Sequence, residues 1–211
     1  METVVGVCDI EGEKFVGVSN TKDNRVCQGD IIKNVKYIEK IAEVDDYLEV
    51  SMINFPYVIV LSQDCDLSED YDFRYNKTKA HENQDKILIS LLVAPLYTAE
   101  QVLAGDHLSE LELPSTGKPM KMQDLRKEKG KKPTSRYNLM TLNEIPRYHY
   151  LKFPGSVTIS DSFIDFKHYF SANVNYLEQL KEKNFVCKIN ELYREAISQR
   201  FSSYLSRIGL P

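Results

Sequence analysis

The first half of the chain alternates apolar runs with polar breaks in the manner of β-strands. The pattern predicts four strands, at residues 31–38, 47–53, 57–62 and 86–96. The second of these alternates apolar and polar side chains, which is typical of a half-buried strand. The third and fourth are continuously apolar and rich in β-branched residues, as central strands of a sheet are. We expect Pro56 at the first position of the third strand, where a missing N–H is tolerated.

Weaker β-patterns flank this core. Residues 3–8 and 15–18 are rich in valine and surround a turn, so they predict a hairpin or two short strands. Between the third and fourth strands the chain is polar and charged, and we predict a long loop there, at residues 66–86. Further strands that would complete the sheet are expected at residues 136–142, 148–153 and 156–170.

Helical patterns lie after the fourth strand and at the C-terminus. Thr98 and Gln101 have the spacing of a capping box, so a short helix is expected at 98–105. Apolar residues recur every three or four positions in residues 191–208, after Asn190 as the N-cap. The predicted buried stripe of this amphipathic helix consists of Ile197, Phe201, Tyr204 and Leu205. A shorter helix is expected before it, at residues 175–185.

Charge is unevenly distributed along the chain. The net charge is −4, yet residues 118–136 hold eight Lys and Arg against two acidic residues, which leaves −10 on the remainder. A basic segment on an acidic body can bind nucleic acid, an acidic partner or its own acidic surface, or it can be a solvated loop. The candidate binding lysines in this segment are Lys127, Lys129, Lys131 and Lys132.

Cysteine usage and hydropathy bear on the compartment. The four cysteines are distant from one another in sequence, and neither they nor the four histidines have zinc-ligand spacing, so we expect free thiols and no metal site or cofactor. No apolar stretch approaches the ~18–20 residues that span a bilayer, and no secretory signal is evident at the N-terminus. These features predict a cytoplasmic protein with no membrane contact.

Cys65, flanked by Asp64 and Asp66, is the residue most open to two interpretations. It is a candidate catalytic thiol, with Asp64 and His81 as the nearest candidate partners in sequence. Neighbouring carboxylates oppose thiolate formation, however, so we predict that Cys65 is a buried, unreactive side chain at the end of the third strand. The two aspartates would then cap backbone N–H groups of the following loop.

Two other roles for acidic residues remain open. Asp64 and Asp66, together with Glu69 or Asp70, could hold a hard cation, although the glycine and the downstream glutamate of a calcium loop are missing. Asp30 is a candidate binding residue or base, but its place after Gly29 favours a turn residue.

Residues 28–96 resemble the start of the MazF/Kid/PemK-type toxins. The resemblance rests on Gly29-Asp30-Ile31, on the strand "PYVIVLS" and on the strand "KILISLLVAPL" that ends at an apolar-Pro turn. It implies a small SH3-like β-barrel, a fold in which many members cleave single-stranded RNA. Phe55 occupies the position of the arginine that those toxins use in cleavage, so the resemblance implies the barrel rather than the ribonuclease.

The whole chain resembles uncharacterised bacterial proteins, some of them associated with mobile elements or phage defence. This second resemblance rests on "LSQDCDL", on "DSFIDF" and on the terminal "YREAISQRFSSYLSRIGLP". It implies a prokaryotic cytosolic protein and no particular activity. We expect, as a separate hypothesis, a protein partner encoded in the same gene cluster.

The sequence therefore predicts an α+β fold with two parts. Residues 1–170 form an SH3-like small β-barrel with an inserted basic loop at 114–136, and residues 171–211 form a helical region packed on it. The predicted function is a non-catalytic interaction or regulatory component of a prokaryotic defence or toxin–antitoxin-like module. The alternative is a nucleic-acid-cleaving, toxin-like hydrolase or a Cys65-dependent enzyme, and nucleic acid is a second candidate partner.

Overall fold

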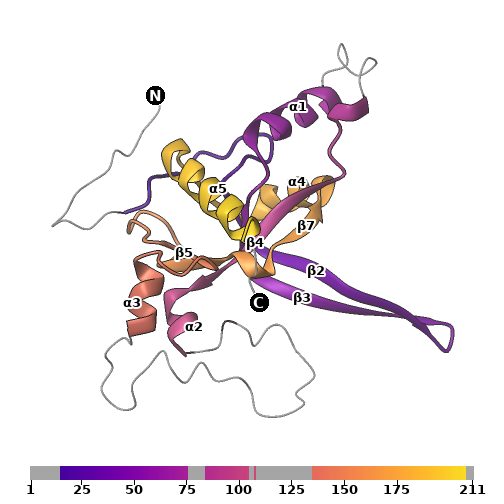
Figure 1. Cartoon of the computed structure of the whole chain (residues 1–211). Helices are drawn as coiled ribbons and strands as arrows, with labels where there is room; N and C mark the ends of the chain where they lie inside the picture. The colour runs from indigo at the N-terminus through magenta and orange to yellow at the C-terminus, as the bar shows by residue number, and fades with distance from the viewer. Residues whose placement is uncertain (1–14, 76–83, 105–106, 108–134, 208–211) are drawn as a thin grey trace.

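The computed structural model describes residues 15–75, 84–104, 107 and 135–207. Within these residues the fold is α+β: one curled, half-barrel sheet of antiparallel strands is surrounded by helices (Figure 1). The strand order is β1-β8-β2-β3-β4-β6-β5, and β7 also pairs with β4. The strands are β1 (Val18–Ser19), β2 (Asp30–Val44), β3 (Tyr47–Val60), β4 (Ser90–Thr98), β5 (Tyr148–Leu151), β6 (Ser162–Asp165), β7 (Phe170–Asn173) and β8 (Phe185–Ile189).

The α-helices of the described residues lie around this sheet. They are α1 (Asp64–Tyr75), α2 (Ala99–Ala104), α3 (Ser135–Thr141), α4 (Val174–Asn184) and α5 (Glu191–Leu205). None of the helices that the structure describes is both long enough and apolar enough to cross a membrane. The segment predicted as a helical region, residues 171–211, supplies β7 and β8 as well as α4 and α5, so its strands belong to the same sheet as the rest.

The third predicted strand does not begin at Pro56. Strand β3 runs without interruption through Pro56 and joins the two strands predicted at 47–53 and 57–62. The register pairs Lys33 with Tyr57 and Val35 with Phe55, so Asn34 lies opposite the proline, which has no N–H to donate. Asn34 has φ +58°, a left-handed conformation that asparagine tolerates better than most residues. The long strand therefore accommodates the proline through a local change in its partner.

Helix α1 replaces the first part of the loop predicted at residues 66–86, up to Tyr75. Its buried residues are Leu67, Asp70 and Phe73, a three-residue spacing that was hidden because one of the three is an acid. Asp70 is satisfied by Arg74, which donates from Nε at 2.8 Å, and by the N–H of Leu88 at 2.6 Å. Helix α3 likewise replaces the strand predicted at 136–142.

The capping box at the start of α2 is confirmed. The N–H of Gln101 donates to Thr98 Oγ1 at 3.2 Å, and the N–H of Thr98 donates to Gln101 Oε1 at 3.0 Å. These reciprocal bonds satisfy two donors that the first turn of a helix leaves without intrahelical partners. The helix therefore begins where the spacing of these two residues predicts.

Helix α5 packs on the sheet through part of the predicted stripe. Ile197 and Phe201 are buried, and the Phe201 ring lies 5.4 Å from that of Phe166 between centroids. Tyr204 is half-buried against the same apolar cluster. Leu205 is 50% exposed, so its predicted burial is wrong: it lies at the last residue of the helix, beyond the contact with the sheet. The Asn190 side chain makes no capping hydrogen bond.

Candidate functional site

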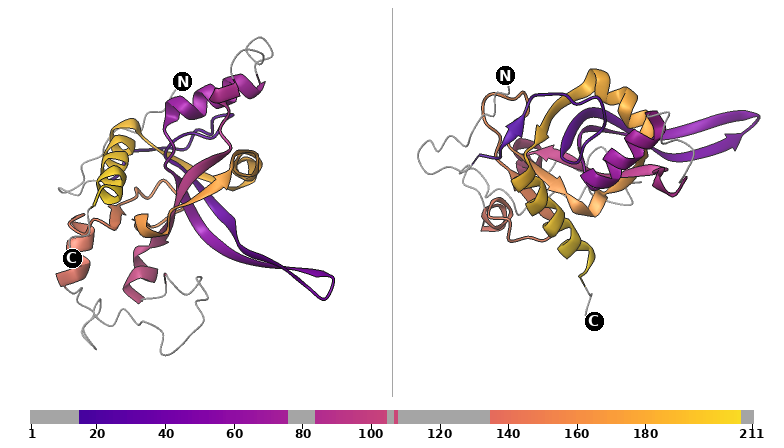
Figure 2. Two further views of the ribbon diagram at one scale, coloured as in Figure 1. Left: turned by 45° about the vertical axis from the view of Figure 1, so that its right-hand side comes forward. Right: turned by 90° about the horizontal axis from the view of Figure 1, so that it is seen from above.

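The hairpin of β2 and β3 extends far beyond the body of the protein (Figure 2). We call its projecting part, residues 36–54, the arm. The body strands pair with the hairpin only near its base: among the described residues, β8 pairs with Asp30–Ile32 and β4 with Tyr57–Val60. The arm is therefore a two-stranded ribbon whose outer half has solvent on both faces.

One face of the arm carries a continuous group of large apolar side chains. Ile38 pairs with Met52 and Ile41 pairs with Val50, and Leu48 lies on the same face because side chains two residues apart on a strand point the same way. These five side chains are between 47% and 72% exposed. We call them, together with Lys36, Glu43 and Asn54 at the two ends, the outer face of the arm.

The opposite face of the arm is anchored on the body at its base. Val35, Ile53 and Phe55 are buried in an apolar cluster. The ring of Phe170 lies 5.0 Å from that of Phe55 and 5.1 Å from that of Tyr37. These contacts hold the base of the arm in a fixed direction and leave the outer face turned away from the core.

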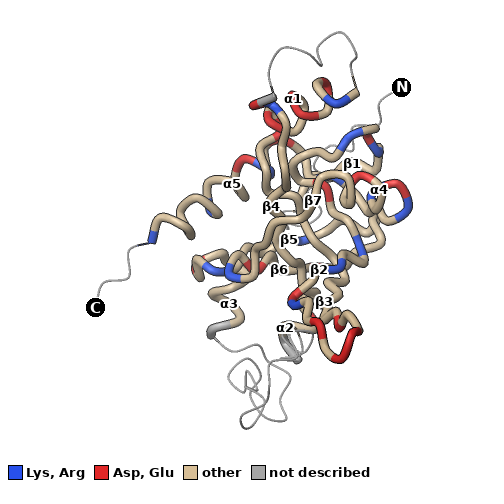
Figure 3. Tube along the Cα trace, turned by 90° about the vertical axis from the view of Figure 1, so that its right-hand side faces the viewer, with Lys and Arg blue, Asp and Glu red and all other residues tan. Residues whose placement is uncertain are grey.

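Charge separates the two ends of the arm. The tip carries Glu43, Asp45, Asp46 and Glu49, and the basic residues Lys33 and Lys36 lie at the base (Figure 3). Seven residues at about 3.3 Å each separate Lys36 from Glu43 along the strand, roughly 23 Å. This distance exceeds the Debye length of about 8 Å at physiological salt, so base and tip act as two distinct patches of opposite sign.

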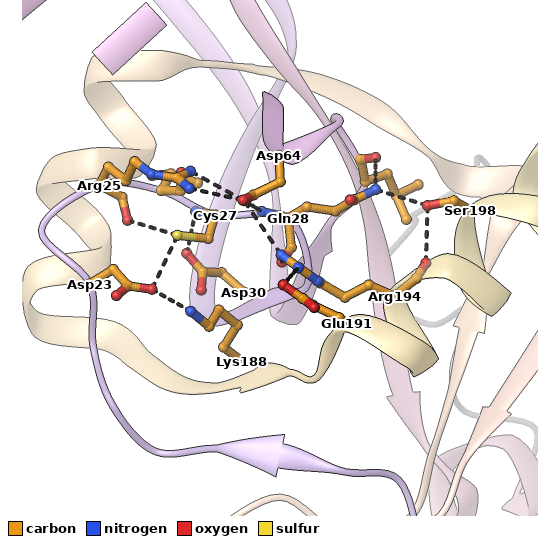
Figure 4. Close-up of polar contacts among 12 residues, drawn as sticks. Asp23, Arg25, Cys27, Gln28, Asp30, Asp64, Lys188, Glu191, Arg194 and Ser198 are labelled. Atoms are coloured by element: carbon orange, nitrogen blue, oxygen red, sulfur yellow. Dashed lines mark hydrogen bonds and ion pairs between the residues drawn. The ribbon is translucent and has the colours of Figure 1, made fainter. Parts of the chain in front are cut away.

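A second cluster brings together Asp64 and Asp30, two residues that the sequence singled out (Figure 4). Asp64 opens α1 and accepts two hydrogen bonds from the guanidinium of Arg25, at 2.9 and 3.2 Å, and one from the N–H of Gln28 at 3.1 Å. Arg194 of α5 lies 3.5 Å from the same carboxylate. Asp64 thus joins the segment before β2 to α1 and to α5.

Asp30 is fully buried at the start of β2. It accepts the N–H of Cys27 at 2.7 Å, which is the turn role expected of it, and it also forms an ion pair at 2.7 Å with the buried ammonium of Lys181. The Lys181 ammonium donates in addition to the carbonyl of Arg25. The sequence did not identify Lys181, because a lysine in a polar helix gives no sign of being buried.

Burial and neighbouring charges set the pKa values in this cluster. Burial raises the pKa of Asp64, but hydrogen bonds from Arg25 and Gln28 lower it more, so this carboxyl ionises below its ordinary range. Burial raises the pKa of Asp30 above its ordinary value despite the opposing charge of Lys181. Burial and the Asp30 carboxylate raise the pKa of Cys27 to about 12, so its thiol stays protonated at neutral pH.

Cys65 is exposed, and the prediction that it is buried is wrong. It lies in the first turn of α1, on the side away from the core, and its Sγ is 3.6 Å from Gln63 Oε1 and 3.5 Å from Asp66 Oδ1. The physical reason is that the chain leaves β3 and turns directly into a helix, whose first buried side chain is Leu67. Asp66 is exposed beside Cys65. The remaining sequence candidates lie outside the described residues: His81, Lys127, Lys129, Lys131 and Lys132.

The acidic residues after β3 do not converge on a cation site. Asp64 faces Arg25, Glu69 forms an ion pair with Lys86, and Asp70 binds Arg74. Within the part of the chain that the structure describes, there is no group of three or more potential metal ligands. Each of these carboxylates instead pairs with a basic side chain of its own.

A polar cavity of about 720 Å³ lies beside this cluster, between residues 22–26, α1 and α4. Several of the polar groups that line it have protein partners. The Lys22 ammonium donates to the carbonyl of Glu182 at 3.0 Å, and the hydroxyl of Tyr75 donates to Glu178 at 2.7 Å. The cavity and the cluster thus form a polar junction that holds four segments of the chain together.

Comparisons with models of protein families, with curated proteins and with solved structures find no match to this chain.

Proposed function

We propose that this protein is a non-catalytic interaction component that binds a protein partner through the outer face of the arm. The observation that carries the proposal is the row of five exposed apolar side chains: Ile38, Ile41, Leu48, Val50 and Met52. Contiguous exposed apolar patches larger than a few hundred Å² are rare on proteins that function alone, and they mark interaction surfaces.

The physical cost of the arm supports the same conclusion. The outer half of the arm is a two-stranded ribbon with water on both faces, and such a ribbon is marginally stable because neither face buries apolar surface against another layer. Exposed hydrophobic strands also invite aggregation. A partner that covers the outer face removes both penalties. The anchoring of Tyr37 and Phe55 on Phe170 keeps the arm extended for that contact and lowers the entropy lost on binding.

The non-catalytic part of the proposal is supported by the way the polar junction uses its charges. Asp64 and Asp30, the acids best placed for chemistry, are each engaged by a basic side chain and by a backbone N–H. General bases need an accessible lone pair and a pKa suited to proton transfer. Ion pairs that join separate segments of the chain are typical of a structural junction.

The setting and the finer form of the fold belong to the same proposal. We place the protein in the bacterial cytosol, in a defence or toxin–antitoxin-like module, and we take the half-barrel to be SH3-like. Support comes from the sequence resemblances and from three free cysteines among the described residues, one of them exposed, which suits a reducing compartment. A gene that stands beside an ATPase or nuclease gene in different genomes would support this setting.

Site-specific photo-crosslinking in the native cells tests the docking role. A photoreactive amino acid at Leu48 should give one dominant covalent adduct, since this side chain lies on the outer face. The same residue at Glu182, exposed on α4, is the matched control and should give none. If Leu48 yields no adduct beyond that of Glu182, the arm is not a docking element and the proposal fails.

A further inference from the structure

We propose that the partner of the arm is a second copy of this chain, bound outer face to outer face with the two arms antiparallel. This inference rests on the docking role proposed above and names its partner. A two-fold axis across the middle of the arm, perpendicular to its strands, would place β2 over β2 of the second copy and β3 over β3. Such an interface is isologous, the commonest arrangement in homodimers.

The order of side chains along the outer face is compatible with this axis. From base to tip the face presents four cross-strand layers: Lys36 with Asn54, Ile38 with Met52, Ile41 with Val50, and Glu43 with Leu48. The two-fold axis exchanges the first layer with the fourth and the second with the third. The two wholly apolar layers therefore cover each other in the centre of the interface, where water is excluded.

Charge selects the antiparallel arrangement over the parallel one. In the antiparallel pair Lys36 of each copy lies over Glu43 of the other, because both belong to β2. The acidic turn at the tip, with Asp45 and Asp46, then lies toward the base of the second arm. A parallel pair would instead bring together two tips, each with Glu43 on the outer face and Asp45 and Asp46 in the turn. Like charges placed together across an interface cost several kcal/mol, so the parallel pair is disfavoured.

The area is sufficient for a specific dimer. The exposed fractions of the five apolar residues correspond to roughly 500 Å² of accessible surface per arm. A pair of arms would therefore bury about 1,000 Å² of accessible surface in total, before the polar rim is counted. This total reaches the lower bound for a biological interface. The centre of the face is apolar while its ends carry charges, as in interfaces with a hydrophobic core and a polar rim.

Sedimentation analysis of charge-exchange variants tests this pairing. The wild-type chain should show a concentration-dependent monomer–dimer equilibrium. Lys36→Glu alone and Glu43→Lys alone each create two like-charge contacts per dimer, and each should raise the dissociation constant at least about tenfold. An equimolar mixture of the two variants should restore dimers, because each heterodimer regains two opposite-charge contacts. Its dissociation constant should return to within about threefold of the wild-type value.

Two controls make the result specific to the outer face. Lys40→Glu makes the same charge change on the arm, but Lys40 pairs with Ser51 on the opposite face, so dimerisation should be unaffected. Ile41→Asp places a charge in the central layers and should abolish the dimer. All of these residues lie on the exposed arm, so the far-ultraviolet circular dichroism of each variant should match that of the wild type. Thermal melts should also match at protein concentrations low enough for the wild type to be monomeric, because dimerisation itself stabilises the folded state.

The outcomes separate this inference from the docking role on which it rests. A wild-type chain that stays monomeric at about 100 µM, where even a weak specific dimer would be populated, overturns the second-copy proposal. So does a failure of the variant mixture to restore dimers. If Leu48 then crosslinks to a different polypeptide, the docking role stands and only the identity of the partner is wrong. If neither experiment detects an arm-dependent species, both proposals fail.

Discussion

The buried carboxylate of Asp165 should make the stability of this protein depend on pH in a way that one substitution removes. Asp165 ends β6 and is fully buried. Arg147 donates to both of its oxygens, at 2.8 and 2.5 Å, and His168 Nδ1 lies 2.9 Å from Oδ2. The N–H of Lys167 donates to Oδ1 at 3.0 Å. Substitution of Asp165 by Asn keeps the shape of the side chain and removes its charge.

The magnitude follows from the pKa of this group. Burial raises the pKa of Asp165, but the hydrogen bonds from Arg147 and His168 outweigh burial and lower it from an ordinary value of 3.8 to about 2. A shift of nearly two pKa units corresponds to about 2.5 kcal/mol of folding free energy at neutral pH. Because the folded pKa is the lower one, this contribution is complete above about pH 4 and is lost as the pH falls toward about 2.

Urea unfolding of the wild type and of Asp165→Asn at several pH values measures this contribution. At pH 6 the variant should be less stable by about 2–3 kcal/mol, and the difference should shrink below about 1 kcal/mol at pH 2.5. Other carboxylates titrate in both proteins and cancel in the difference. Asp66→Asn, the same change at an exposed position in α1, should cost less than about 1 kcal/mol. A difference for Asp165→Asn that is equal at pH 6 and pH 2.5 would refute the electrostatic argument.

Three further predictions concern α5, the cysteines and the basic segment. Phe201→Ala should lower the free energy of unfolding by about 3–5 kcal/mol, whereas Leu205→Ala should lower it by less than about 1 kcal/mol. Both values can be measured by urea titration, and equal losses would contradict the packing described for α5. Mass spectrometry after brief alkylation of the native protein should find Cys65 modified but Cys27 and Cys187 protected. The two protected thiols are buried, and burial raises the pKa of each to about 12. Modification of all three thiols at equal rates would disprove this difference. The association constant for single-stranded RNA should fall by about 0.7 log unit per phosphate contact for each tenfold rise in salt concentration. This slope should become shallower when four lysines of the basic segment are neutralised: Lys127, Lys129, Lys131 and Lys132. An unchanged slope would exclude these lysines as phosphate contacts.

Elements with strong local signals could be predicted from the sequence. The capping box of Thr98 and Gln101 is formed within four residues, so no distant contact is needed to specify it. Helix α4 lies within one residue of its predicted bounds. Strands β3 and β4 cover most of the predicted apolar runs, although β3 joins two predicted strands and β4 begins at Ser90 instead of Lys86. Helix α1 could not be predicted, because one of its three buried side chains is Asp70, which is tolerated in the core only through Arg74 and Leu88.

The polar junction was predictable only in part. Asp64 and Asp30 stood out in the sequence because they border apolar strands and a turn. Their partners Arg25, Arg194 and Lys181 lie in a loop and on two different helices, and a basic residue there has no local feature that separates it from a solvated one. The tertiary fold determines which of these charged residues form ion pairs, and the local sequence around each residue does not specify its partner.

In the arm, the apolar pattern of the sequence does not correspond to burial within the chain. The alternation in residues 47–53 predicts a half-buried strand, yet Leu48, Val50 and Met52 are exposed. On the facing strand, Ile38 and Ile41 are three residues apart, and in a regular strand they would point to opposite faces. A register shift between Ile38 and Lys40, where Glu39 is the additional residue, returns Ile41 to the outer face. The irregularity thus aligns two exposed isoleucines with Met52 and Val50, and these four side chains form the central layers of the proposed interface.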